Sequence, residues 1–171
     1  NYSIYYYIKY KLINIIIFFY LYIIKMNDNI FKNLLIYIIS FCSGIFIITY
    51  LLKVPHLITG NNEIVNQYYL STFMKNLPLD FLFVLLYFLF AHIFIRLNNI
   101  KKNSTKILII VICTVILTGG FCYYFTTRKQ TTNFFSKWFH TVGYSSILYD
   151  VILLVAIYII YLYLDKLITS N

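Results

Sequence analysis

Residues 107–125, ILIIVICTVILTGGFCYYF, form a run of nineteen residues that contains no charged side chain. About 20 apolar residues is the length of an α-helix that crosses the roughly 30 Å hydrocarbon core of a bilayer. Inside lipid, the backbone N–H and C=O groups have no water to bond, so a spanning segment pairs them within itself as a helix. The stretch therefore predicts a membrane-spanning α-helix.

Three further runs of similar length and composition lie at about 34–52, 79–97 and 147–164. None of the four runs contains an interior proline, and none shows the alternation of polar and apolar residues that is typical of barrel strands. The sequence predicts an all-α integral membrane protein. Its single domain, residues 26–171, is a bundle of four transmembrane helices.

The composition supports lipid as the solvent of this chain. Hydrophobic residues make up 61% of the sequence, charged residues make up 11%, and the mean hydropathy is +0.79. Soluble domains carry about 25% charged residues. The net charge of +9 comes from cations placed between the apolar runs. That placement is typical of anchors at the interface of a lipid bilayer and does not indicate a nucleic-acid partner.

Residues 1–25 allow two interpretations. They draw on only seven residue types, all supplied by AT-rich codons, and the first methionine of the chain is Met26. The first hypothesis is that they are translated upstream sequence and that the native protein starts at Met26. The alternative is an extra hydrophobic segment, Leu12–Ile24, which is shorter than the roughly 17 residues needed for an upright span.

The two long connections between spans each predict a short amphipathic helix. In the first, Glu63–Lys75, apolar residues recur at helical spacing after Asn62, a plausible N-cap. In the second, Asn133–Val142, Asn133 can cap the start and Gly143 the end. The second helix is expected to lie in the membrane interface, anchored by its aromatic side chains Trp138, Phe135 and Phe139.

Both connections join an odd-numbered span to the next even-numbered one, so both are predicted on the same side of the membrane. The short loop on the other side, Asn98–Lys106, is rich in lysine. Because short cytoplasmic loops carry an excess of Lys and Arg, this loop and both termini are predicted to be cytoplasmic.

Small residues at helical spacing mark places where helix backbones can approach closely. The first span has Ser40 and Gly44, and the third has Thr118 and Cys122 beside two glycines. We predict that spans one and three pack along these faces. The alternative is a homo-oligomer formed through Ser40 and Gly44, or through Gly119 and Gly120.

Ionisable residues inside spans are costly, which makes them the first candidates for a functional site. Asp80 follows Pro78 at the start of the second span, where it can also simply stabilise a helix N-terminus. Asp150 lies inside the fourth span and needs a partner, either Lys137, His140 or a tyrosine hydroxyl. Both carboxylates are expected near the face that carries the amphipathic helices.

The same face carries three more polar residues, so the predicted polar cluster is Asp80, Asp150, His140, Lys137 and His56. The three histidines lie in three separate segments and lack the spacing of a metal site. No P-loop or G-x-S-x-G motif occurs in the sequence. We therefore predict no catalytic residue, no metal and no cofactor.

Two stretches resemble uncharacterised multi-pass membrane proteins encoded by large DNA viruses. They are residues 78–92, PLDFLFVLLYFLFAH, and residues 134–154, FFSKWFHTVGYSSILYDVILL. The shared features include Trp138, Gly143, Tyr149 and Asp150. The resemblance implies a viral membrane protein and brings no activity or ligand with it.

Three functions compete at this point. The first is a structural or scaffolding role in a viral or host-derived membrane. The second is a small oligomeric channel or proton pathway that uses Asp80 and Asp150. The third is an enzyme that acts on lipid at the interfacial helices.

Overall fold

The computed structural model describes residues 27–169. Every element within this range is a helix, and turns join the helices. The segment 1–25, with its two interpretations, lies outside the described residues. The chain divides into two compact units, Asn1–Ile38 and Ile39–Asn171. The first unit contains the start of helix α2, and the second contains the elements described below.

Within residues 27–169, four helices are long and apolar enough to cross a membrane, as the sequence predicts. The first is α2 (Asn27–Ile45), which continues into the π-helical segment η1 (Phe46–Leu51). The others are α5 (Phe73–Leu97), α6 (Asn103–Thr126) and α8 (Ser145–Thr169). Each exceeds the predicted apolar run because the helix continues into the polar residues that flank it.

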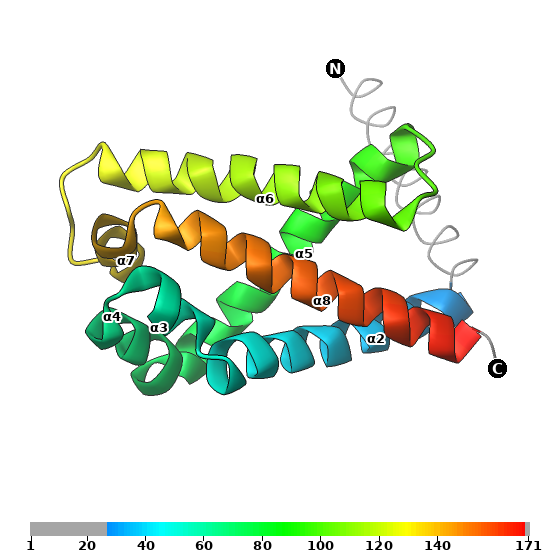
Figure 1. Ribbon diagram of the computed structural model, residues 1–171, viewed down its shortest axis with the longest axis horizontal. Helices are drawn as coiled ribbons and strands as arrows, with labels where there is room; N and C mark the ends of the chain where they lie inside the picture. The colour runs from blue at the N-terminus through cyan, green and yellow to red at the C-terminus, as the bar shows by residue number, and fades with distance from the viewer. Residues whose placement is uncertain (1–26, 170–171) are drawn as a thin grey trace, which may run out of the picture. The chain divides into compact units, whose positions relative to one another are not determined.

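The connector elements are α3 (Val54–Thr59), α4 (Asn62–Asn66), the π-helical η2 (Gln67–Ser71) and α7 (Phe134–Val142). They lie at one end of the second unit, at the left of Figure 1. The ring of Tyr68 packs against Phe134 and Trp138, with centroids 5.0 and 5.1 Å apart. The two connections therefore lie at the same end of the second unit, and their place on one side of a membrane stays a prediction.

The predicted amphipathic helix at Glu63–Lys75 is wrong in its bounds. Asn61, rather than Asn62, is the N-cap: its side-chain oxygen accepts a hydrogen bond from the Ile64 N–H at 3.1 Å. The helix widens into η2 and ends at Thr72, whose N–H donates to the Gln67 carbonyl at 3.0 Å. The residues after Thr72 begin α5. The apolar stripe continues across this break, so the periodicity predicts one helix where the structure has the end of η2 and the start of α5.

The bounds of α7 agree with the prediction. The side-chain oxygen of Asn133 accepts a hydrogen bond from the Phe135 N–H at 3.0 Å, as an N-cap does. Gly143 follows the helix with φ of 57°, a conformation that favours glycine.

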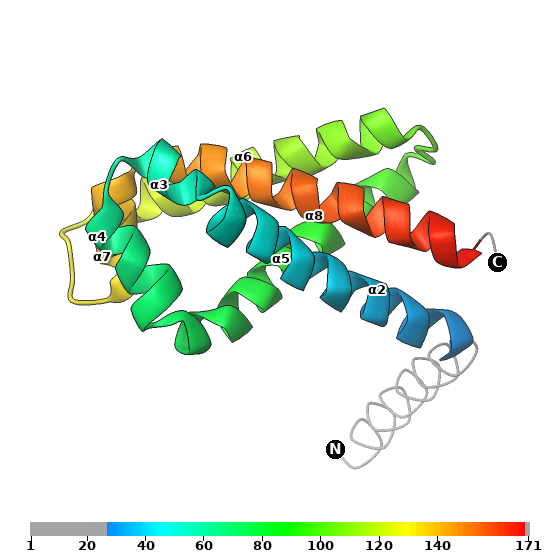
Figure 2. The same ribbon diagram turned by 60° about the horizontal axis from the view of Figure 1, so that its bottom comes forward.

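The first span packs against the fourth, contrary to the predicted pairing of spans one and three. A Cβ added at Gly44 would lie 2.4 Å from Cγ1 of Ile157 in α8, so α2 and α8 touch closely there. Gly119 of α6 also faces α8, at Ile147. Helix α8 lies beside α6 in both Figure 1 and Figure 2. The small residues mark close approach, as predicted, but the partner is α8 in both cases.

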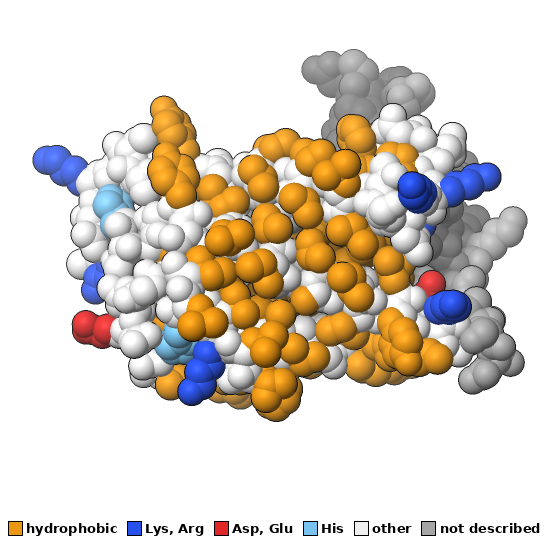
Figure 3. All heavy atoms as spheres, viewed as in Figure 1, with side chains coloured by type: hydrophobic (Ala, Val, Ile, Leu, Met, Phe, Trp, Pro, Cys, Tyr) orange, Lys and Arg blue, Asp and Glu red, His pale blue; other side chains and the backbone are white. Residues whose placement is uncertain are grey.

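The outer surface of the long helices is apolar. On the face shown in Figure 3, hydrophobic side chains cover α6 and α8, and Lys and Arg side chains lie toward the two ends. Exposed residues on this surface include Leu108, Ile112, Ile116 and Ile159. A soluble protein of this size rarely exposes so large an apolar area. The distribution is that of helices whose outer faces contact lipid.

Candidate functional site

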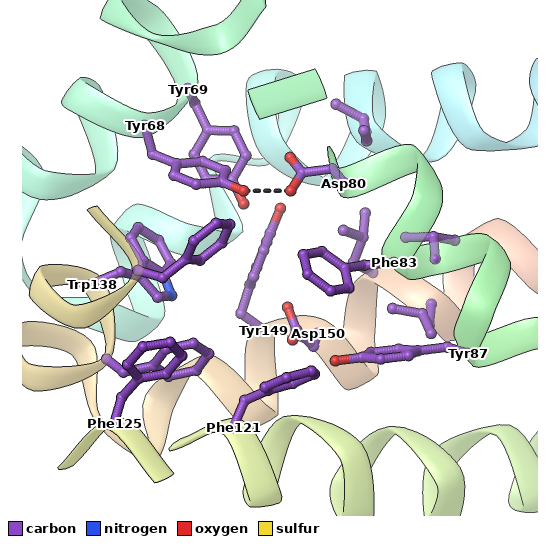
Figure 4. A pocket seen from close by; sticks show the side chains of 16 residues that line it. Tyr68, Tyr69, Asp80, Phe83, Tyr87, Phe121, Phe125, Trp138, Tyr149 and Asp150 are labelled. Carbon is purple, nitrogen blue, oxygen red and sulfur yellow. Dashed lines mark hydrogen bonds between the residues drawn. The ribbon is translucent and has the colours of Figure 1, made fainter. Parts of the chain in front are cut away.

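A cavity of about 170 Å³ lies at the connector end of the second unit. Helices α5, α6 and α8 form its walls, and η2 and α7 cover it. Figure 4 shows that most of the side chains around it are aromatic. The aromatic residues are Tyr68, Tyr69, Phe83, Tyr87, Phe121, Phe125, Phe135, Trp138, Phe139 and Tyr149. Two carboxylates, Asp80 and Asp150, interrupt this apolar lining.

Asp80 reaches the cavity from α5 and accepts a hydrogen bond from the Tyr68 hydroxyl of η2. The helix begins at Phe73, so Asp80 follows its first residue by seven positions. A carboxylate stabilises a helix dipole only within the first turn. Stabilisation of the helix start therefore does not account for Asp80, and Pro78 lies inside the helix as well.

Asp150 lies in the second turn of α8 and accepts a hydrogen bond from the Thr118 hydroxyl of α6, with the oxygens 2.7 Å apart. The Tyr87 hydroxyl of α5 lies 3.0 Å from the same Thr118 oxygen. Because Thr118 has one proton and gives it to Asp150, Tyr87 is the donor in this second bond. The polar chain Tyr87–Thr118–Asp150 thus joins three of the long helices.

Among the described side chains and loops, each carboxylate has a donor for one of its two oxygens. Tyr68 bonds Oδ1 of Asp80 and Thr118 bonds Oδ2 of Asp150, and within residues 27–169 no other side-chain or loop donor reaches either group. None of the described residues that line the cavity is Lys, Arg or His. The charge of an ionised carboxylate here is therefore balanced only by a proton or by a cation that enters from outside.

Two π-helical turns place the hydroxyl groups of the site. In a π-helix the N–H bonds the carbonyl five residues back, so successive side chains are separated by a smaller angle than in an α-helix. In η2 this directs the neighbouring residues Tyr68 and Tyr69 into the cavity. In η1, Thr49 lies 2.9 Å from the Tyr149 hydroxyl, and the Tyr50 hydroxyl donates to the Tyr69 carbonyl at 2.8 Å.

The two tyrosines of η2 remain protonated donors. Burial, with the nearby Asp80 charge as a second cause, raises the pKa of Tyr68 well above its ordinary value. Burial also raises the pKa of Tyr69, with smaller effects from Tyr149 and Asp80. Neither hydroxyl carries negative charge at neutral pH, so the acidic character of the cavity comes from its two aspartates.

The structure does not gather the five residues of the predicted polar cluster in one place. Asp80 and Asp150 share the cavity, but His56, Lys137 and His140 do not line it. His140 contacts the carbonyl oxygens of Ser136 and Arg128, at 2.7 and 3.0 Å. The Nε2 atom of His56 lies 2.9 Å from the Asn66 side-chain oxygen. Lys137 is exposed on α7, pointing away from the buried face that carries Trp138.

The predicted interfacial anchor residues line the cavity, and their seating in a membrane interface stays a prediction. Trp138 and Phe139 are 7% and 8% exposed, and together with the half-buried Phe135 they line the cavity. The apolar face of α7 therefore packs on protein, and Trp138 contacts Tyr68 and Tyr69. A protein core and a lipid interface both produce this pattern of apolar residues, so the pattern alone does not distinguish them.

Sequence reasoning missed the hydroxyl groups that hold the two carboxylates. Tyrosine occurs nineteen times in the chain, so nothing in the sequence singles out Tyr68 or Tyr87. Thr118 was noted only as a small residue at a helix contact. Its position four residues before Cys122, on the face of α6 that meets α8, was the available signal. Within the described residues no three His, Cys, Asp or Glu side chains lie close enough together to hold a metal ion.

The hydrogen bonds of Thr118 can be tested against a matched threonine one turn away. Thr118→Val removes the donor to Asp150 and the acceptor for Tyr87, and should lower the unfolding free energy by about 1–2 kcal/mol. Thr114 is equally buried, but its hydroxyl bonds only the Ile110 carbonyl of its own helix, at 2.8 Å. Thr114→Val should cost less than about 0.5 kcal/mol. Thermal unfolding in detergent micelles measures both, and equal effects would contradict the interhelical role.

The comparisons with known proteins give no relative from which a site could be transferred. No protein-family model matches the chain, and no curated protein or solved structure is significantly similar to it.

Proposed function

We propose that the protein is a four-span membrane protein whose cavity binds a small organic cation. The observation that carries the proposal is the pairing of two carboxylates with an aromatic lining that contains no cationic side chain. A buried charge is costly unless it is paired. An ammonium group supplies the missing positive charge, and its N–H groups can bond the carboxylate oxygens that have no donor among the described side chains and loops.

The aromatic rings suit the same ligand. A cation over the face of Trp, Tyr or Phe is attracted by the ring quadrupole, and the attraction reaches about 2 kcal/mol when the site is dry. Phe83, Tyr87, Trp138 and Tyr149 lie around the two carboxylates (Figure 4). The apolar part of an organic cation gains further from burial among these rings. An inorganic cation would lose its hydration shell without that gain.

The size of the cavity sets an upper limit on the ligand. A cavity of about 150 Å³ is known to hold benzene in another protein. The volume of about 170 Å³ here is therefore suited to a ligand of roughly six to eight non-hydrogen atoms.

A proton pathway is the second candidate, and the chain Tyr87–Thr118–Asp150 favours it because it joins hydroxyl groups to a carboxylate. A scaffolding role in a viral or host-derived membrane stays a prediction from the sequence, and it does not call for a cavity with two carboxylates. A lipid-acting enzyme would depend on the two aspartates, since the described lining contains no Ser, Cys, His or Lys.

If the protein crosses the membrane four times, the connector end and the opposite end of the second unit should be accessible to reagents from opposite sides of the membrane. Asn62 lies among the connector elements and Asn103 begins α6 at the other end, and both are exposed. In a background where Cys42, Cys113 and Cys122 are replaced by alanine, we expect Asn62→Cys and Asn103→Cys to react from opposite sides of sealed vesicles. A membrane-impermeant maleimide reports this. Reaction of both cysteines from one side would contradict four crossings.

The binding part predicts a saturable response of Trp138, the single tryptophan of the chain. Because this ring lines the cavity, n-butylammonium should change its fluorescence emission, whereas butyrate and 1-butanol at the same concentrations should not. Asp150→Asn removes one counter-charge and should weaken butylammonium binding at least about tenfold, which corresponds to about 1.4 kcal/mol.

Asp165→Asn is the matched control for this titration. Asp165 lies on the same helix, near the far end of α8, and does not line the cavity. Its variant should bind butylammonium as the unmodified protein does. Equal responses to butylammonium and butanol, or equal weakening by both variants, would contradict the proposal.

A further inference from the structure

The geometry points to a short α,ω-diamine, with an ammonium group at each end of an apolar chain, as the class of cation that the cavity takes. This inference rests on the proposed function. It adds a requirement for two positive charges in one ligand and for an apolar spacer between them.

The first support is that the two carboxylates are separate binding points. Asp80 comes from α5 and is held by Tyr68 of η2, whereas Asp150 comes from α8 and is held by Thr118 of α6. The two carboxylates therefore have different hydrogen-bond donors. In the view of Figure 4, the rings of Phe83 and Tyr149 lie between them.

The second support is hydrogen bonding. One oxygen of each carboxylate has a protein hydroxyl as its donor, and within residues 27–169 the other oxygen has none. An ammonium group has three N–H donors. A ligand with an ammonium at each end satisfies both free oxygens, whereas a monoamine satisfies one and leaves the other without a partner.

The third support is charge balance. When both aspartates are ionised they give the cavity two negative charges, and its described lining supplies no positive side chain. A monoammonium ion neutralises one of them, and the remaining charge stays buried without a partner. A diammonium ion neutralises both. A metal dication is a poorer match, because Ca²⁺ takes six to eight oxygen ligands and the cavity offers two carboxylates.

The fourth support is the match between the spacer and the walls. The side chains around the carboxylates are aromatic or aliphatic, including Val84, Phe121 and Leu154. Methylene groups gain about 0.8 kcal/mol each on burial in such surroundings. 1,4-Diaminobutane has six non-hydrogen atoms, as many as benzene, and so fits the size limit set by the cavity.

The test compares three ligands with the same four-carbon chain on the unmodified protein in lipid nanodiscs, read by Trp138 fluorescence. The ligands are 1,4-diaminobutane, 4-amino-1-butanol and n-butylamine, at a pH where the amines are protonated. 4-Amino-1-butanol replaces one ammonium by a hydroxyl at constant atom count. We expect 1,4-diaminobutane to bind at least about tenfold more tightly than either monoamine.

The same titration on Asp80→Asn assigns the second charge. With one carboxylate removed, the advantage of the diamine over 4-amino-1-butanol should fall to less than about threefold, while Asp165→Asn keeps it. If the unmodified protein binds all three amines equally, the result contradicts the diamine inference and still supports the proposed function. If it binds none of the three amines, the result contradicts both the diamine inference and the proposed function. The ligand series needs no variant, so a folding defect of Asp80→Asn leaves the test decisive.

Discussion

A carboxylate surrounded by aromatic rings must find hydrogen-bond donors and a positive charge, and the arrangement at the connector end of this protein follows from that requirement. Asp150 lies in a turn of α8 that is otherwise apolar, and Thr118 on α6 meets it. Thr118 in turn receives the Tyr87 hydroxyl of α5. One charged group thus determines which faces of three long helices must meet.

The connector elements meet the same requirement for Asp80. If η2 were an ordinary α-helical turn, Tyr68 and Tyr69 would diverge more widely around the axis. The π-helical turn brings both into the cavity, where Tyr68 bonds Asp80. Helix α7 closes the site by placing Trp138 against both tyrosines. The described lining thereby supplies a hydroxyl donor to each carboxylate but no positive side chain, and this lack is the physical reason to expect a cationic ligand.

The sequence predicts the four long helices well because hydropathy over nineteen residues depends little on neighbouring elements. The caps of α7 were predicted for a similar reason: Asn133 and Gly143 act locally. The helix at 63–75 was misjudged because a π-turn and the break at Thr72 leave the apolar period almost unchanged. The small residue Gly44 indicates that another helix comes close, but not that the helix is α8. Asp80 and Asp150 were predicted on one face because both lie at the start of even-numbered spans. The positions of their donors Tyr68 and Thr118 depend on tertiary packing, which the sequence does not show.

The most direct test of the central claim is a distance measurement between ligand nitrogen and protein carboxylate in a lipid bilayer. Solid-state NMR with ¹³C-labelled aspartate and ¹⁵N-labelled butylammonium reports ¹³Cγ–¹⁵N dipolar coupling at each of the four aspartates, Asp28, Asp80, Asp150 and Asp165. We predict coupling at Asp80, Asp150 or both, at the separation of an ion pair, and none at Asp165. Coupling absent from both cavity aspartates at saturating butylammonium would contradict the account.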